Sequence, residues 1–352
     1  MGEKREFIAR SEARRPLFVG IDLGGTNTKV GVVDDLGRPL SWLTVPTHPE
    51  RGPEDAAARM GQAVRDAVAE AGLEMKEIAR VGLGSPGTMD ISAGMLIEPV
   101  NLKGPRGDEW NHFPIRDRVA HHCGLPVAFE NDANAAAYGE FWVGSGRDFH
   151  SLVLFTLGTG IGCGIIIGDM IVDGEHSHGA ECGHIIIDDS PTARLCGCGK
   201  LGHLEAYASA TAVVARTKEA LAAGRKSSLA GRLAGGDELT PLVVAEEAES
   251  GDQLALEIVL QTAEYLGAGV VNLMHTIDPT GVLLGGAMTF GGHESALGRR
   301  FLERVREEVR RRAFTVLAQR TVIDFASLGG DAGYIGAAGI ARLEHQALQT
   351  NR

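Results

Sequence analysis

The hydrophobic positions along the chain predict alternating strands and helices. An apolar run at Leu17–Ile21 is followed by a glycine-rich bend and a second run at Lys29–Val33, which predicts a β-hairpin. The same arrangement returns at Leu152–Leu157 and Gly164–Ile167, again with a glycine-rich bend between the runs. This weak internal repeat predicts an α/β protein with two related halves, in which ligands would bind in the cleft between the halves.

Further helices and short strands are predicted between and after these hairpins. The first helix has Pro53 near its start and Gly72 at its end, the positions that helices favour for these residues. The polar, glycine-containing stretch Gly224–Thr240 is expected to be an exposed loop. The expected helices are Pro53–Gly72, Ala133–Trp142, Glu205–Ala223, Gln253–Thr276, Glu294–Arg312 and Tyr334–His345, and the further strands are Arg80–Leu83, Pro126–Phe129 and Val282–Leu284.

Composition argues against a nucleic-acid partner. The 352 residues are 44% apolar and 23% charged, which is ordinary for a globular protein of two domains. The net charge of −12 argues against binding to a nucleic-acid backbone, although solubility alone would also account for the acidity.

No targeting or membrane segment is expected. The N-terminal residues are charged and lack the apolar core of a signal peptide, and the apolar run Ile161–Val172 is too short to span a bilayer. Five cysteines, two of them in a C-x-C pair, suit a reducing compartment. We therefore expect a cytoplasmic protein without a membrane partner.

Two glycine-rich bends are candidates for phosphate binding. In the first, Asp22–Thr28, glycines let backbone N–H groups face an anion, Thr26 and Thr28 add hydroxyl groups, and Asp22 could hold Mg²⁺. A hairpin turn that uses glycine for geometry alone is the alternative. The second bend, Leu157–Gly162, strengthens the phosphate hypothesis, because two such loops could clamp the β- and γ-phosphates of ATP.

Other nucleotide motifs do not fit. The chain has no GxxxxGK[ST] sequence and is therefore not a P-loop protein. Gly82–Gly87 matches G-x-G-x-x-G, but the next residues, Thr88–Gly94, are turn-like and do not open a helix. We interpret this segment as a loop lining the substrate cleft.

The sequence Glu130-Asn131-Asp132 lies between an expected strand end and an expected helix start. Asp132 could cap the helix, or it could act as the general base that takes a proton from a substrate hydroxyl, and the two roles are compatible. Asn131 would add hydrogen bonds. Phosphoryl transfer needs little beyond positioning, charge stabilisation and an oriented nucleophile.

A short span collects four candidate metal ligands: His184, Cys196, Cys198 and His203. Two thiolates and two imidazoles suit a tetrahedral zinc ion, and with all four positions filled by protein the site would be structural. Buried cysteines and solvent-exposed histidines are the alternative interpretation. Two acids, Glu181 and Glu205, flank these ligands and suggest that the metal would shape a binding pocket.

Five blocks of sequence occur in the order DLGGTNTK, ENDANAAAYGE, LGTGIGCGIIIGDMIVDGEHSHGAECGH, CGCGKLGHLE and LLGGAM. Together they resemble the ROK family of sugar kinases, and the family's bacterial glucokinases look closest. The resemblance covers the chain from Leu17 onward.

The resemblance implies the actin-like, hexokinase-type (ribonuclease H-like) two-domain α/β fold with a cleft between the domains. We expect a small N-terminal domain at 1–134, on which a C-terminal helix at about 337–352 packs. A large domain with the zinc loop is expected at 135–336. A homodimer or homotetramer is implied by the resemblance alone.

The implied activity is phosphorylation of the 6-hydroxyl of a hexose, glucose above all, with ATP and Mg²⁺. Asp132 would be the catalytic base. The implied sugar-binding residues are Asn131, Asp132, Glu181, His184, Glu205, Gly87 and Asn101. The implied nucleotide-binding residues are Asp22, Gly24, Gly25, Thr26, Asn27, Thr28, Gly158, Thr159, Gly160, Gly285 and Gly286.

The zinc loop departs from the family pattern at one position. His184, Cys196 and Cys198 match the family's zinc ligands, whereas His203 stands where the family usually has cysteine. Because imidazole is a good zinc ligand, we expect a structural Zn²⁺ to be retained.

Several alternatives share these features. N-acetylmannosamine, mannose, fructose and allose kinases of the family contain the same blocks, and the loop Ser85–Trp110 would select among sugars. Polyphosphate could replace ATP as the donor, although Gly285-Gly286 favours a nucleotide. A non-catalytic sugar-sensing regulator without a DNA-binding domain is the rival from another class, but Asp132 and both glycine-rich bends favour an enzyme.

Overall fold

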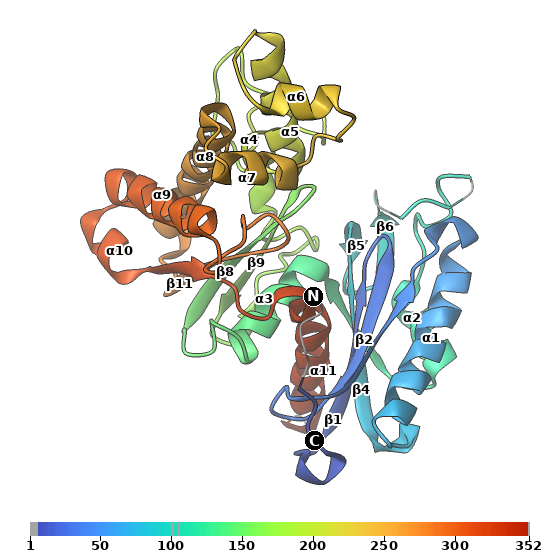
Figure 1. Cartoon of the computed structure of the whole chain (residues 1–352). Coiled ribbons are helices and arrows are strands. Elements are labelled where there is room, and N and C mark those ends of the chain that lie inside the picture. Colours follow the sequence, from blue (N-terminus) through green and yellow to red (C-terminus); the bar gives the residue numbers. More distant parts are fainter. Residues whose placement is uncertain (1–5, 100–101, 105, 351–352) are drawn as a thin grey trace. The chain divides into compact units, whose positions relative to one another are not determined.

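The computed structural model describes residues 6–99, 102–104 and 106–350 and divides into two compact units (Figure 1). The first unit comprises Met1–Asp148, Gly164–Ala180 and Leu328–Arg352, and the second comprises Phe149–Cys163 and Glu181–Ser327. The chain thus passes from one unit to the other several times. The domain boundaries expected from the sequence, after residue 134 and near residue 337, stay a prediction.

A five-stranded sheet forms the centre of the first unit. Its order is β3-β2-β1-β4-β7, with β1 antiparallel to β2 and parallel to β4, which is in turn parallel to β7. Asp22 on β1 pairs with Gly84 on β4, and Gly84 pairs with Glu130 on β7, so the carboxyl ends of three parallel strands lie at one level. The strands are β1 Leu17–Leu23, β2 Asn27–Val33, β3 Pro39–Pro46, β4 Ile78–Ser85 and β7 Val127–Asn131.

Successive side chains of β1 point alternately to the two faces of this sheet, and helices cover each face. Leu17, Val19 and Ile21 belong to the buried core shared with α1, whereas Phe18 contacts His345 on the opposite side. Because successive strand residues point to opposite faces, β1 is buried on both. The helices of this unit are α1 Pro53–Glu70, α2 Ile115–Cys123, α3 Asp132–Trp142 and α11 Ala332–Thr350, and a small hairpin is formed by β5 Thr88–Asp90 and β6 Met95–Glu98.

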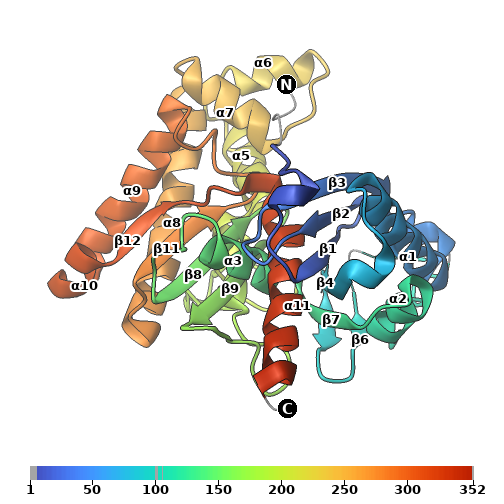
Figure 2. The ribbon, with the colours of Figure 1, turned by 90° about the horizontal axis from the view of Figure 1, so that it is seen from below.

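Helix α11 packs against β1, β4 and α3 with backbone close to backbone (Figure 2). A Cβ atom on Gly20 would lie 1.7 Å from the carbonyl oxygen of Tyr334, and one on Gly82 would lie 1.8 Å from that of Ala337. On the other side of α11, a Cβ on Gly336 would lie 1.6 Å from the carbonyl oxygen of Ala135. These contacts exclude any side chain, so glycine fixes the position of α11.

A second five-stranded sheet, ordered β10-β9-β8-β11-β12, carries the glycine-rich bend of the second unit between β8 and β9. Strands β8, β11 and β12 are mutually parallel. The strands are β8 Ser151–Leu157, β9 Ile161–Ile167, β10 Met170–Ile171, β11 Gly281–Gly285 and β12 Val322–Phe325. The helices are α4 Glu205–Ala208, α5 Ala210–Ala222, α6 Leu229–Ala234, α7 Pro241–Glu249, α8 Gln253–Ile277, α9 Ala296–Arg312 and α10 Thr315–Arg320.

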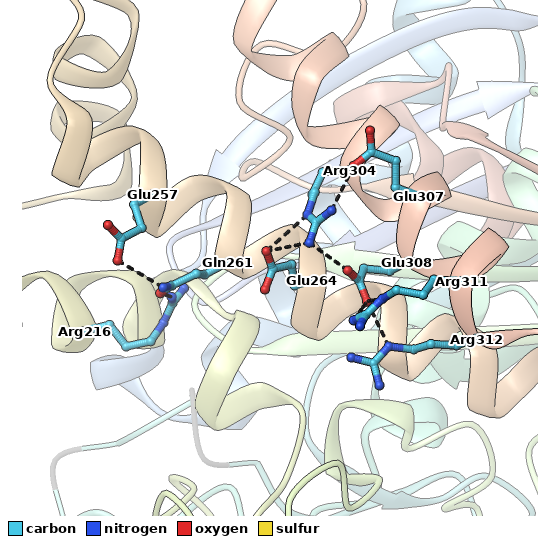
Figure 3. A network of polar contacts seen from close by, with 9 residues as sticks. All are labelled: Arg216, Glu257, Gln261, Glu264, Arg304, Glu307, Glu308, Arg311 and Arg312. Carbon is cyan, nitrogen blue, oxygen red and sulfur yellow. Dashed lines mark hydrogen bonds and ion pairs between the residues drawn. The ribbon is translucent and has the colours of Figure 1, made fainter.

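Figure 3 shows how a buried carboxylate joins the arginines of α9. Glu308 is fully buried and accepts hydrogen bonds from Arg311 at 2.5 Å and from Arg312 at 2.8 Å. Burial alone would raise the pKa of Glu308, but these arginines outweigh it and hold the pKa below its ordinary value. Arg304 reaches both Glu308 and Glu264, which ties α9 to α8.

By length and composition, α8 could cross a membrane, and no other helix in the described part of the chain meets the same test. The evidence for a membrane span is weak, because 61% of its most apolar window is buried inside the structure. Its contacts with α9, α7, α4 and α5 are those of a core helix.

The expected α/β fold is confirmed, and four local expectations are wrong. Gly82–Gly87 is not a loop throughout, because its first four residues belong to β4. Gly224–Thr240 is not all loop, because α6 forms within it and buries Leu229. The helix expected over Glu205–Ala223 is broken at Ser209, whose side chain caps α5 by accepting from the N–H of Ala212. The turn expected at Thr88–Gly94 contains β5, which pairs with β6.

Replacing Gly336 with alanine tests the packing of α11. The new methyl group cannot fit against Ala135, so the helices must separate, and the free energy of unfolding should fall by about 1–3 kcal/mol. The matched control is Gly231→Ala in α6, where a Cβ meets nothing within 4 Å and stability should rise by up to about 1 kcal/mol. Urea unfolding followed by circular dichroism measures both changes, and equal stability of the two variants would contradict the packing argument.

Candidate functional site

The first glycine-rich bend is held by Thr47, which precedes α1. Its hydroxyl donates to the carbonyl of Gly24 at 2.6 Å, and its N–H donates to the carbonyl of Thr26 at 2.8 Å. The Thr28 hydroxyl, expected to face a phosphate, is buried and lies 3.0 Å from the Thr47 hydroxyl. Gly25, Thr26 and Asn27 form the exposed part of the bend.

Asp22 lies beside the start of α11. A Cβ on Gly333 would approach an Asp22 carboxylate oxygen to 2.6 Å, and Lys29 Nζ lies 3.9 Å from the carboxylate. Burial raises the pKa of Asp22, and the charge of Lys29 opposes the rise only in part. A cation beside this carboxylate would favour its ionised form, so the position fits a direct or water-mediated role with Mg²⁺.

The junction between β7 and α3 presents Asp132 at the start of a helix. Asn131, not Asp132, is the N-cap: its Oδ1 accepts from the N–H groups of Ala133 and Asn134 at 2.9 and 3.2 Å. The capping role considered for Asp132 is therefore wrong. Asp132 is the first residue of α3, partly exposed, and its Oδ1 accepts from the N–H of Ala133 at 2.8 Å. The positive end of the helix dipole favours an ionised carboxylate there.

In the second unit, the bend Gly158–Gly160 is anchored to α5. The N–H of Ala210 donates to the carbonyl of Gly158 at 2.9 Å, and the Thr211 hydroxyl donates to that of Thr159 at 2.8 Å. At Gly286, with φ of +88°, a Cβ would lie 2.4 Å from the carbonyl oxygen of Leu157. The Gly285-Gly286 turn therefore packs directly against the strand that leads into this bend.

A pocket of about 210 Å³ opens beyond Gly286. Its wall combines apolar side chains with the carboxylates of Glu246 and Glu249. Such a pocket suits a flat heterocycle that carries an amino group, because apolar surface can stack on the rings while a carboxylate accepts from the amine. The lining residues are Pro241, Leu242, Ala245, Glu246, Glu249, Ala287, Met288, Phe290, Gly291 and Ser295.

The structure brings His184, Cys196, Cys198 and His203 together, with one ligand atom of each within 4.8 Å of the others. The Nδ1 atoms of the two histidines are 3.3 Å apart, and the sulfur–nitrogen separations are 3.2 Å for Cys198–His203 and 3.8 Å for Cys196–His184. Zinc bonds of about 2.0 Å to nitrogen and about 2.3 Å to sulfur require tetrahedral edges of about 3.3–3.8 Å. These three separations lie close to such edges, whereas the bound of 4.8 Å for the whole cluster is longer, so a tetrahedral metal ion would draw the four side chains closer together.

Burial shifts the pKa values of two of these four side chains. The pKa of the Cys196 thiol is raised to about 11, above all by burial; the backbone hydrogen bond from Cys198 opposes the rise, and the Cys198 side chain and Glu205 contribute to it. Burial, with the nearby His184, lowers the pKa of His203, so its imidazole is neutral and able to coordinate near neutral pH. Metal binding would release the Cys196 proton.

Glu205 connects the metal cluster to the second glycine-rich bend. One carboxylate oxygen accepts from the N–H of Ile161 at 2.9 Å, and the other lies 3.5 Å from the sulfur of Cys196. A Cβ on Gly160 would lie 2.4 Å from the first oxygen, so glycine is needed for this approach. His184 turns its second ring nitrogen toward Glu181, at 3.9 Å.

Gly87, another expected sugar contact, lies beside the β5–β6 hairpin. Gly87, with φ of +93°, packs against Pro99, where a Cβ would come within 2.6 Å of the proline Cα. Asn101 lies outside the described residues.

Two contacts of the candidate site were not anticipated from the sequence. Lys29 donates to the carbonyl of Gly330 at 2.5 Å, which brings α11 to Asp22, and Thr47 braces the first bend. Lys29 and Gly330 are 301 positions apart, so no local pattern could have paired them.

Residues 18–344 match the ROK family, and the chain belongs to this family. A glucokinase from Streptomyces coelicolor is 35% identical over 93% of this chain and 98% of its own length. Among solved structures, a ROK hexokinase from Thermus thermophilus is 33% identical with a TM-score of 0.78, and covers 94% of this chain and 99% of its own. A ROK family glucokinase from Streptomyces griseus, in complex with glucose and AMPPNP, is 35% identical with a TM-score of 0.72, covering 93% and 99%.

These similarities extend over nearly the whole chain, and they confirm the actin-like two-domain fold. They also place the protein among the ATP-dependent sugar kinases of the ROK family.

Proposed function

We propose that this protein transfers the γ-phosphoryl group of ATP to the 6-hydroxyl of glucose, with Asp132 as the general base. The position of Asp132 carries the proposal: its carboxylate is partly exposed at the start of α3, beside the carboxyl ends of β1, β4 and β7. In parallel sheets with helical connections, ligands bind outside this edge. The Streptomyces griseus relative, crystallised with glucose and AMPPNP, supports the choice of both substrates.

The chemistry requires one proton transfer and one substitution at phosphorus. The sugar hydroxyl donates its proton to the Asp132 carboxylate as its oxygen bonds to the γ-phosphorus, and the bond to the bridging oxygen of ADP breaks. Asn131 keeps its amide Nδ2 for a sugar hydroxyl, because its Oδ1 caps α3. Backbone N–H groups of both glycine-rich bends would hold the phosphates, and Mg²⁺ near Asp22 would offset their charge.

The pocket beyond Gly286 supports ATP as donor. Polyphosphate has no base to fill a space of about 210 Å³, whereas adenine can stack on its apolar wall and donate its amino group to Glu246 or Glu249. The pocket therefore favours a nucleotide over polyphosphate.

We further propose that His184, Cys196, Cys198 and His203 hold a structural zinc ion. Their spacing suits tetrahedral coordination, and a site with four protein ligands has no open position for catalysis. Coordination through Nδ1 would fix the His184 ring with its other nitrogen beside Glu181, where both could bind sugar hydroxyls. Glu205 would hold the Gly158–Gly160 bend at a set distance from the same cluster.

The regulator hypothesis requires sugar binding without chemistry, and nothing in that role needs Asp132 or a nucleotide pocket.

Among sugars, glucose is proposed over N-acetylmannosamine, mannose, fructose and allose. Steady-state release of ADP, measured with each of these sugars in turn, tests the choice. Highest kcat/KM with another sugar would reject glucose, and no ADP release with any sugar would favour the regulator. Cytoplasmic location and assembly as a homodimer or homotetramer stay predictions.

Replacing Asp132 with asparagine should lower kcat about 10²–10⁴-fold, because an amide cannot accept the hydroxyl proton. The KM for glucose should change only a few-fold, since the amide still forms hydrogen bonds. Asp148→Asn is the control: its side chain is 87% exposed and its kinetics should match the wild type. A kcat for Asp132→Asn near that of the control would reject the assignment of the base.

Metal analysis of the purified chain tests the zinc proposal. The wild type should contain one zinc per chain, and Cys196→Ser should lose it and melt at lower temperature, because metal binding contributes to folding of the loop. His203→Cys should keep the metal, since Cys₃His also binds zinc. Cys123→Ala, which alters a buried cysteine outside the cluster, should keep it as well. Full zinc content in Cys196→Ser, or none in the wild type, would contradict the proposal.

A further inference from the structure

Glu130 is a buried acid immediately before Asn131 and Asp132. Only 4% of the residue is exposed, and it lies on β7 opposite Gly84 of β4. Its Oε1 accepts two hydrogen bonds, from the backbone N–H of Asn131 at 2.8 Å and from the side-chain amide of Asn134 at 3.0 Å. One carboxylate oxygen therefore connects the end of the strand to the first turn of the helix.

Asn134 depends on this carboxylate for its orientation. The residue is 3% exposed, and its Oδ1 is buried with no hydrogen-bond partner among the described residues. Among the described residues, the hydrogen bond from Asn134 Nδ2 to Glu130 is therefore what holds this side chain. Since a buried polar group is costly to leave unpaired, loss of the carboxylate would free Asn134 and the N–H of Asn131 together.

We propose that Glu130 is a positioning residue for the phosphoryl transfer: its ionised carboxylate holds the β7–α3 junction so that Asn131 and Asp132 face the sugar, and its protonation loosens that junction. The inference rests on the proposed function. The ionised form is the holding form because Oε1 accepts two N–H groups, and hydrogen bonds to a charged acceptor are stronger than those to a neutral one.

The surroundings of Glu130 make its ionisation relevant at working pH. The pKa of Glu130 is raised to about 7, above all by burial; the negative charges of Asp173 and Glu344 contribute to this rise, and the hydrogen bonds from Asn134 and Asn131 oppose it. Glu344, on α11, is itself paired with Arg80 on β4 at 2.9 Å. With a pKa of about 7, the ionised fraction grows as the pH rises through neutrality, so turnover should grow with it.

The pH dependence of kcat between about pH 5.5 and 9 tests this role. Protonation of a general base, or of a residue that positions it, changes kcat with pH. For the wild type, kcat should rise with an apparent pKa of about 7. Glu130→Gln keeps an oxygen that can accept both N–H groups but cannot ionise. Its kcat should lack that step and at pH 8 should be about 3- to 30-fold below the wild type, with the glucose KM changed less than about 3-fold.

Two further variants separate positioning from folding. Asn134→Ala removes one donor to the carboxylate, so the step should move to higher pH. Glu344→Gln removes a nearby negative charge outside the site, so the step should move to lower pH while the plateau kcat stays unchanged. Both remain informative if Glu130→Gln fails to fold, as judged by its thermal melting.

The outcomes are distinct. An unchanged step near pH 7 in folded Glu130→Gln, or an unmoved step in both Asn134→Ala and Glu344→Gln, would overturn the role of Glu130 and leave the kinase proposal intact. A wild-type protein that phosphorylates no hexose would overturn both.

Discussion

Close backbone packing of α11 is the constraint on which the first unit depends. Helix α11 Ala332–Thr350 reaches β1 and β4 only because Gly20 and Gly82 carry no side chains, and it reaches α3 only because Gly336 carries none. This packing fixes α3, and α3 in turn begins at Asp132. It also brings Gly333 and the carbonyl of Gly330 to Asp22 and Lys29. Helix α11 thus positions Asp22 and Lys29 at the carboxyl edge of the sheet.

In the second unit, one carboxylate, that of Glu205, contacts two loops. Glu205 holds the N–H of Ile161 with one oxygen and lies beside Cys196 with the other. A change at the metal cluster would therefore reach the Gly158–Gly160 bend through a single side chain. A zinc ion held by the proposed ligands would take no part in phosphoryl transfer, but it would hold His184, and Cys196 beside Glu205, in place.

The sequence predicted the elements and the polar clusters, but not the contacts that orient them. Both β-hairpins, the long helices and the grouping of His184 with Cys196, Cys198 and His203 followed from local pattern, and the structure contains them. Local pattern could not show that Thr28 turns its hydroxyl inward to Thr47, because that bond joins different strands and loops. Nor could it decide between Asn131 and Asp132 as the cap, since both residue types cap helices and only the backbone dihedrals distinguish them. The short strands β5 and β6 were missed because strands of three and four residues have too little alternation to detect.

A crystal structure of the wild type with glucose and AMPPNP would show whether Asp132 can act as the base, since a general base must lie within hydrogen-bond reach of the proton it takes. We expect the glucose 6-hydroxyl within about 3 Å of the Asp132 carboxylate. We also expect N–H groups of the glycine-rich bends to bind the γ-phosphate and adenine to fill the pocket beyond Gly286. A glucose molecule whose 6-hydroxyl points away from Asp132, or a nucleotide bound elsewhere, would rule out this mechanism.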